Sequence, residues 1–323
     1  MSGRLLGLGC GQPDGSAELL LKAALMAAEQ AGAEVELVRL DDLRIPSGPD
    51  PAEPDDAWWL WERLVEADAL IVSTPIISRT VAARLKLLGD RLLGPNADAA
   101  IIEELVRLRR AGEEPAVPFR VDERVLKPRV AGFIAVGGSL TPQWKTLALP
   151  IMHTVTFSMQ IAVVDQVQFE GAGTPRSIAL DEAALDRAGR LGRNVADEIG
   201  RPFAQAEYRG DDPGLCPHCH LDVVVLRGTQ VECATCGARG TLAVEGGEAV
   251  VRFTDEGSVI TMAEKREHFF EIQATARRHA ERRDEIESRA RTYAGYDRRT
   301  APGSSTRPDS SSATDASPIS TTP

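Results

Sequence analysis

The sequence predicts a doubly wound α/β domain with a five-stranded parallel sheet, followed by a small four-cysteine module and a long C-terminal helix. Three observations lead to this prediction. Short apolar runs alternate with amphipathic stretches through residues 4–200, which is the pattern of repeated βαβ units. Glycine-rich turns follow the first and fourth of these runs, and two Cys-x-x-Cys pairs lie near residue 225.

The apolar runs define the expected strands in order. Leu5, Leu6 and Leu8 indicate the first strand, and a helix is expected over residues 17–32 because its leucines and alanines recur at helical spacing. The remaining strands are expected at residues 34–40, 69–74, 130–136 and 159–167, and the clearest further helices at residues 57–67 and 180–199. The sheet domain should cover residues 1–205, with an insertion at about 95–128 that contains a charged helix.

The turn after the first strand predicts an anion site. A strand, a glycine-rich turn and a helix N-terminus together present backbone N–H groups and the positive end of the helix dipole. The dinucleotide fingerprint Gly-x-Gly-x-x-Gly fails here, because its third glycine would fall on Asp14. That failure argues against the alternative of a dinucleotide-binding dehydrogenase in which Arg39 would contact a 2′-phosphate.

Two later motifs match the spacing of one family. The third strand runs into the sequence TPIIS at positions 74–78, and the next stretch contains Leu85-Lys86 and then GDR at 89–91. Together with the first loop, these motifs resemble the flavodoxin-like NADPH-dependent FMN reductases and the related iron–sulfur flavoproteins. The resemblance covers roughly residues 4–200 and implies a flavodoxin-like sheet. Residues 41–56 contain no cysteine, so we expect no iron–sulfur cluster.

The first loop keeps the family's spacing while losing several polar side chains. Gln12 stands where the family has its phosphate-binding arginine, and Ser16 and Ala17 replace asparagine and threonine. Cys10 replaces a serine, and Ile77 in the second motif replaces a tyrosine. Backbone donors and Ser16 would then hold the phosphate. We expect Cys10 to be a phosphate-loop residue; a reactive thiol is the alternative, because a helix N-terminus can lower a thiol pKa.

The resemblance implies an FMN-dependent NAD(P)H oxidoreductase that passes electrons to a quinone, a free flavin or another small acceptor. Such an enzyme needs no catalytic acid or base, because the protein positions the ring and tunes it. His153 is therefore expected to be a core residue. The FMN-binding residues are expected in three loops at the carboxyl ends of strands one, three and four. They are Cys10, Gln12, Gly15, Ser16, Ala17, Pro75, Ile76, Ile77, Ser78, Gly137, Gly138 and Ser139.

The four paired cysteines predict a zinc ribbon over residues 210–256. Each Cys-x-x-Cys knuckle turns two thiolates toward one point, and two knuckles complete a tetrahedral site. The ligands would be Cys216, Cys219, Cys233 and Cys236. A rubredoxin-like iron site with the same ligands stays open as an alternative. A second hypothesis for the whole chain is a non-catalytic, flavodoxin-like interaction protein whose ribbon docks a partner.

Composition excludes some partners. The net charge of −11 and the pI of about 5.1 argue against nucleic acid, since phosphate contacts need clustered Lys and Arg. No apolar run is long enough for a membrane span, and no signal-peptide layout begins the chain, so we expect a cytoplasmic protein. We also expect a homo-oligomer, a dimer or tetramer. A long helix is predicted over 260–296 and a disordered Ser/Thr/Pro-rich tail over 297–323.

Overall fold

The computed structural model describes residues 3–48, 53–254, 256–296 and 298. The chain divides into two compact units, residues 1–276 and 277–323. Apart from position 298, the tail predicted over 297–323 lies outside the described residues. No helix in the described part of the chain is both long and apolar enough to cross a bilayer.

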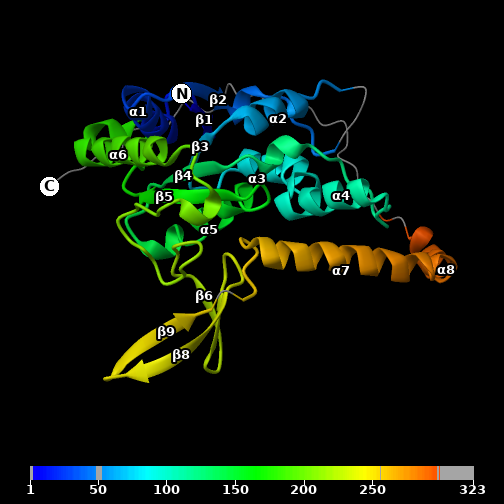
Figure 1. Cartoon of the computed structure of the whole chain (residues 1–323). Coiled ribbons are helices and arrows are strands. Elements are labelled where there is room, and N and C mark those ends of the chain that lie inside the picture. Colours follow the sequence, from blue (N-terminus) through cyan, green and yellow to red (C-terminus); the bar gives the residue numbers. More distant parts are fainter. Residues whose placement is uncertain (1–2, 49–52, 255, 297, 299–323) are drawn as a thin grey trace. The chain divides into compact units, whose positions relative to one another are not determined.

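The first unit is built on a five-stranded parallel sheet with the order β2-β1-β3-β4-β5 (Figure 1). This order confirms the predicted flavodoxin-like fold. The central strands are buried along nearly their whole length because helices cover both faces of the sheet. The strands are β1 (Arg4–Gly9), β2 (Glu34–Arg39), β3 (Ala69–Pro75), β4 (Arg129–Val136) and β5 (Ile161–Phe169).

Two hydrophobic clusters lie on the two faces of the sheet. Helices α1 (Ser16–Gln30) and α6 (Glu182–Glu198) pack on one face, and a glycine allows their close approach. A Cβ added to Gly192 of α6 would lie 1.9 Å from the carbonyl oxygen of Ala24 in α1. The other face is covered by α2 (Ala57–Glu66), α3 (Ala83–Leu92) and α5 (Ala148–Met152).

The expected insertion forms α4 (Ala99–Ala111), which begins at Asp98, whose carboxylate accepts from the amides of the first turn. Helix α7 (Met262–Ala280) packs along it (Figure 1). Phe269 is buried against apolar side chains of α4, Arg266 pairs with Glu104, and Gln273 makes two hydrogen bonds to the backbone of Val117. Helix α7 therefore buries the outer face of the insertion.

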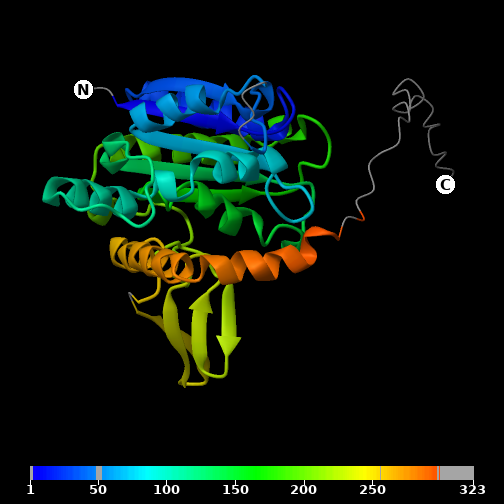
Figure 2. The same cartoon turned by 90° about the vertical axis from the view of Figure 1, so that its right-hand side faces the viewer.

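The four-cysteine module is an antiparallel sheet with the order β6-β7-β8-β9, and its β8–β9 hairpin projects from the parallel sheet (Figures 1 and 2). It packs beside β5. Gln166 of β5 donates to the carbonyl oxygens of Cys219 and His220, and the Arg209 amide donates to Val164 O at 2.6 Å. The strands are β6 (Val224–Arg227), β7 (Gln230–Cys233), β8 (Arg239–Glu245) and β9 (Glu248–Phe253).

The prediction of a single helix over 260–296 is wrong in one respect. The segment forms two helices, α7 and α8 (Arg283–Ala294). The chain tightens into a turn between them, where the Arg282 amide donates to His279 O three residues back. No glycine or proline marks this break. None of the described residues of α8 is buried, so no packed face keeps the two helices continuous.

A buried arginine joins the end of the insertion to the sheet. The side chain of Arg129, at the start of β4, is fully buried. Burial lowers the pKa of Arg129 to about 10, so the group stays charged at neutral pH. It donates to the carbonyl oxygens of Val65, Ala67, Arg124, Val125 and Lys127.

We expect Arg129→Met to lower the free energy of unfolding by roughly 3 kcal/mol or more, because it leaves several buried carbonyls without a donor. Arg129→Lys keeps the charge with fewer donors, so its free energy of unfolding should lie between those of the wild type and Arg129→Met. The control is Arg4→Met, which breaks exposed ion pairs with Glu34 and Glu66. Urea unfolding measures all three; equal midpoints for Arg129→Met and Arg4→Met would contradict the assignment.

Candidate functional site

A cavity of about 340 Å³ lies at the carboxyl edge of the parallel sheet. It is formed by the loops that follow β1, β3, β4 and β5. All the residues predicted in three flavin loops line it, except Ser78 and Ser139, which line an adjoining cavity. Its lining is Cys10, Gly11, Gln12, Gly15, Ser16, Ala17, Pro75, Ile76, Ile77, Val136, Gly137, Gly138 and residues 172–175.

Backbone hydrogen bonds fix these loops to one another. The Cys10 amide donates to Ser73 O at 2.9 Å, and the Gly137 amide donates to Phe169 O at 3.0 Å. The loop after β4 also touches the loop after β5 so closely that a Cβ added to Gly138 would lie 2.9 Å from Gly173 Cα. The glycine at 138 is thus required for loop packing.

Two backbone amides of the first loop already donate hydrogen bonds to carboxylates. Gly11 has a φ of 103°, which favours glycine, and its amide donates to the Asp41 carboxylate at 2.7 Å. The Asp14 amide donates to the Glu18 carboxylate at 3.1 Å. Two donors of the glycine-rich turn are therefore unavailable to a bound anion.

The start of α1 keeps free donors. Ser16 Oγ is buried and has no hydrogen-bond partner among the described residues. The first-turn amides of a helix have no acceptor within the helix. The hydroxyl and the amides that follow it in α1 can therefore bind an anion at the Ser16 end of the cavity.

A second cavity of about 320 Å³ adjoins the first and shares Ile76, Gly137 and Gly138 with it. One wall is a tight turn in which Ile77 and Thr80 exchange both backbone hydrogen bonds. The turn residues Ser78 and Arg79 both have positive φ, at 49° and 74°, a strained conformation for non-glycine residues.

The far wall of this second cavity comes from the segment after β4. Trp144 is 56% exposed there, and Lys145 is held by an ion pair with Glu170. Arg79 donates through Nε to Gln143 O at 2.7 Å, which fixes the strained turn against this segment. The second cavity therefore offers an aromatic face and two cationic groups.

Sequence reasoning missed three parts of the site. It did not predict the loop at 172–175, although Gly171 and Gly173 beyond the fifth strand were a usable signal of close backbone approach. It also missed Arg79 and Trp144, which no local pattern distinguishes from exposed loop residues.

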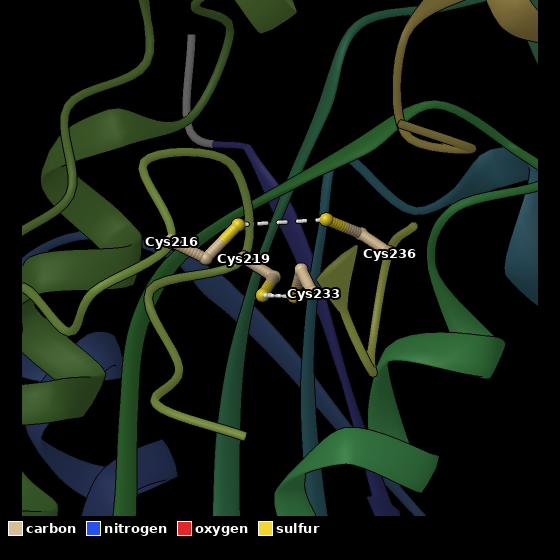
Figure 3. A group of neighbouring side chains, drawn as sticks. All are labelled: Cys216, Cys219, Cys233 and Cys236. Carbon is tan, nitrogen blue, oxygen red and sulfur yellow. Dashed lines mark hydrogen bonds between the residues drawn. The ribbon is translucent and has the colours of Figure 1, made fainter. Parts of the chain in front are cut away.

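The four predicted metal ligands lie together and are all buried (Figure 3). Their Sγ atoms lie within 4.8 Å of one another, and the pairs Cys216–Cys236 and Cys219–Cys233 are 3.5 and 3.4 Å apart. Tetrahedral zinc with Zn–S bonds of about 2.3 Å needs sulfurs roughly 3.8 Å apart. The cluster therefore fits a four-thiolate metal site.

The two knuckles repeat one local structure. In each, the residue after the second cysteine has a positive φ, and its amide donates to the first cysteine's carbonyl at 2.9 Å; these residues are His220 and Gly237. His220 stacks on Tyr208, and its Nδ1 lies 3.2 Å from Pro213 O. Neither His218 nor His220 belongs to the described ligand cluster.

Residues 4–169 match the family of NADPH-dependent FMN reductases. A flavone synthase from Aspergillus candidus is 36% identical over 273 residues, which are 78% of this chain and 82% of that protein. The chain belongs to the NADPH-dependent FMN reductase family. An iron–sulfur flavoprotein from Methanocaldococcus jannaschii is 26% identical over 207 residues, 59% of this chain and 94% of that protein.

The solved structure of a flavone reductase extends the similarity to nearly the whole of this FMN reductase family member. It superposes with a TM-score of 0.78 at 28% identity, and the match covers 93% of this chain and 100% of that chain. Because the coverage runs well beyond residue 169, the similarity includes most of the chain after the parallel sheet.

A larger open groove of about 820 Å³ runs between α1 and α6. Two of its three arginines are already paired: Arg187 with Asp165 and Asp211, and Arg190 with Asp211. It lies away from the strand ends that form the family's loops. The cavities at the sheet edge are therefore the candidate functional site of this FMN reductase family member.

Burial shifts the pKa values of two further groups, His153 and Cys10. His153 is fully buried and hydrogen-bonded to Gln166 at 3.0 Å, and burial lowers its pKa to about 4, which confirms it as a core residue. Burial, and then the Asp41 carboxylate, raise the pKa of the Cys10 thiol to about 12. A hydrogen bond with Thr74 lowers the pKa but does not offset these effects.

We expect Cys10 of the folded protein to react with iodoacetamide at pH 8 roughly a thousandfold more slowly than an ordinary cysteine. The thiolate is the reacting form, and a pKa of about 12 leaves almost none of it at that pH. Peptide mass spectrometry measures the rate, and urea-unfolded protein is the control. Labelling of folded Cys10 at the unfolded rate would establish a reactive thiol instead.

Proposed function

We propose that this chain is an FMN-dependent NAD(P)H oxidoreductase that reduces a flat, conjugated aromatic carbonyl compound, such as a flavone or a quinone. Family membership already makes it a flavin-dependent NAD(P)H reductase. The observation that carries the finer proposal is the pair of joined cavities at the sheet edge, one bordered by the family's phosphate loop and the other by an aromatic side chain.

The first cavity fits FMN. Its orphaned, buried Ser16 hydroxyl and the first-turn amides of α1 would hold the phosphate, and the backbone near Pro75 and Gly137 would border the ring. Bound FMN would supply hydride transfer: the nicotinamide would give two electrons and one proton, and water would supply the second proton of the reduced acceptor. The chain itself would orient both partners.

The acceptor class is supported by the second cavity and by the relatives. Trp144 offers an aromatic face for stacking, and Arg79 and Lys145 can hydrogen-bond an acceptor's carbonyl or phenolic oxygen. The relatives named as a flavone synthase and a flavone reductase are similar to this chain over most of its length. Both names describe chemistry on a flat bicyclic ring that carries such oxygens.

The purified chain should bind FMN and, with NADH or NADPH, reduce a flavone or a quinone under anaerobic conditions. Trp144→Leu should raise the KM for the acceptor about tenfold with the Kd for FMN unchanged, because it removes a stacking face from the second cavity alone. The matched control is Trp58→Leu, an equally exposed tryptophan of α2.

Flavin fluorescence gives the Kd, and acceptor-dependent NAD(P)H oxidation gives kcat and KM. A wild type that binds no FMN at millimolar concentration would support the alternative, a flavodoxin-like interaction protein. Equal KM values for Trp144→Leu and wild type would move the acceptor elsewhere while leaving the flavin proposal intact.

We further propose structural zinc at Cys216, Cys219, Cys233 and Cys236. The support is a buried four-sulfur cluster with near-tetrahedral spacing, held by two equivalent knuckles. So short a module buries little core of its own, and metal binding would supply its folding free energy. A rubredoxin-type iron centre would use the same ligands.

Metal analysis of the purified chain should give one zinc per chain. Cys216→Ser should lose the metal and make residues 210–256 sensitive to protease, while FMN binding survives because the parallel sheet has its own core. His218→Ala should keep the zinc. Stoichiometric iron with a rubredoxin-type visible spectrum would reject zinc and indicate electron transfer.

A further inference from the structure

A cation from a distant part of the sequence lies beside the first loop. Arg176 follows Thr174 and Pro175, two residues of the cavity wall, and its guanidinium lies 3.7 Å from the Asp14 carboxylate in the first loop. The backbone of this loop is fixed, because the Ser177 amide and hydroxyl both donate to Thr174 O. Arg176 thus projects from a rigid support at the edge of the cavity.

The first loop needs a cation if it is to bind a phosphate. Gln12 is uncharged, while Asp14, Glu18 and Asp41 place three carboxylates on or beside the loop. A dianionic phosphate at the start of α1 would be repelled by these groups, and the helix dipole offsets only part of such a repulsion.

The cations near the first loop differ in how closely they are paired with carboxylates. Lys22 is bound to both Asp14, at 2.8 Å, and Glu18, at 2.7 Å. Arg39 is bound to Asp42 at 2.7 Å and faces Glu18. The 3.7 Å pair between Arg176 and Asp14 is longer than a hydrogen bond, and the Arg176 side chain is 67% exposed. Arg176 can therefore turn toward an anion at little cost.

We propose that Arg176 binds the phosphate group of FMN and replaces, from the loop after β5, the cation that the first loop lacks at Gln12. This inference rests on the proposed flavin function and deepens it. Arg176 is a binding residue and takes no part in electron transfer. Asp14 keeps its partner Lys22 when Arg176 moves, so the exchange leaves no carboxylate unpaired.

The proposed role of Arg176 affects binding of the phosphate group alone. A guanidinium can make two parallel hydrogen bonds to phosphate oxygens, whereas the uncharged ribityl and ring of riboflavin offer it no anion. Arg176 should therefore determine how strongly the chain prefers FMN to riboflavin. An arginine placed at position 12 should perform the same task from within the first loop.

We expect Arg176→Gln to raise the Kd for FMN about tenfold and leave the Kd for riboflavin unchanged. Gln12→Arg should tighten FMN binding, and in the double variant it should restore the affinity lost by Arg176→Gln. Arg193→Gln, an exposed arginine of α6 outside the cavity, is the matched control and should bind both flavins as the wild type does. Fluorescence titration of the full chain measures each Kd, and raised salt should weaken FMN binding to the wild type more than to Arg176→Gln.

Three results would overturn the inference, and they differ in what else they affect. If FMN binds wild type and Arg176→Gln equally, the phosphate lies elsewhere and the flavin function stands. If the wild type prefers riboflavin or binds neither flavin, both the inference and the proposed flavin function fail. A loss of riboflavin affinity equal to the loss for FMN would show that Arg176 only supports the loop.

Discussion

Parallel pairing of the five strands is the constraint on which the site depends, because it brings every carboxyl end to one edge. Beyond the strand ends the pairing continues as single backbone hydrogen bonds: Cys10 to Ser73, Ile76 to Val136, and Gly137 to Phe169. These bonds link the loops after β1, β3, β4 and β5 into one rigid rim. The cavities are hollows in this rim, so residues far apart in sequence meet there without any long flexible segment.

The first loop is held in its turn by hydrogen bonds from backbone amides to carboxylates. Carboxylates of Asp41 and Glu18 satisfy two amides of the turn, which stabilises the turn and makes its surroundings negative. Burial beside Asp41 also keeps the Cys10 thiol protonated. In the proposed flavin site, the positive charge then has to come from outside the loop, and the loop after β5 is the neighbour that carries it.

Strand β5 lies at the edge of the sheet and also contacts the four-cysteine module. An exposed edge strand invites pairing with other chains, and here the four-cysteine module covers it. Gln166 connects the two parts: its oxygen faces His153 in the core, and its amide nitrogen donates to the first knuckle. The core histidine, the edge strand and the cysteine cluster are therefore one hydrogen-bonded structure within the first unit.

The sequence by itself determined the features that arise from local chemistry. Apolar periodicity predicted the strands and most helices, glycine spacing predicted the rim loops, and the paired cysteines predicted the four-sulfur cluster, because each pattern acts over a few residues. Only the tertiary structure decided which residues meet between those loops. Arg176 lies beside Asp14, and Asp41 accepts from the Gly11 amide. Trp144 and Arg79 line the same cavity. The tertiary structure also decided the break between α7 and α8, which no residue marks. Such features depend on long-range contacts and on the direction in which a side chain leaves its backbone, and neither has a signature in the neighbouring residues.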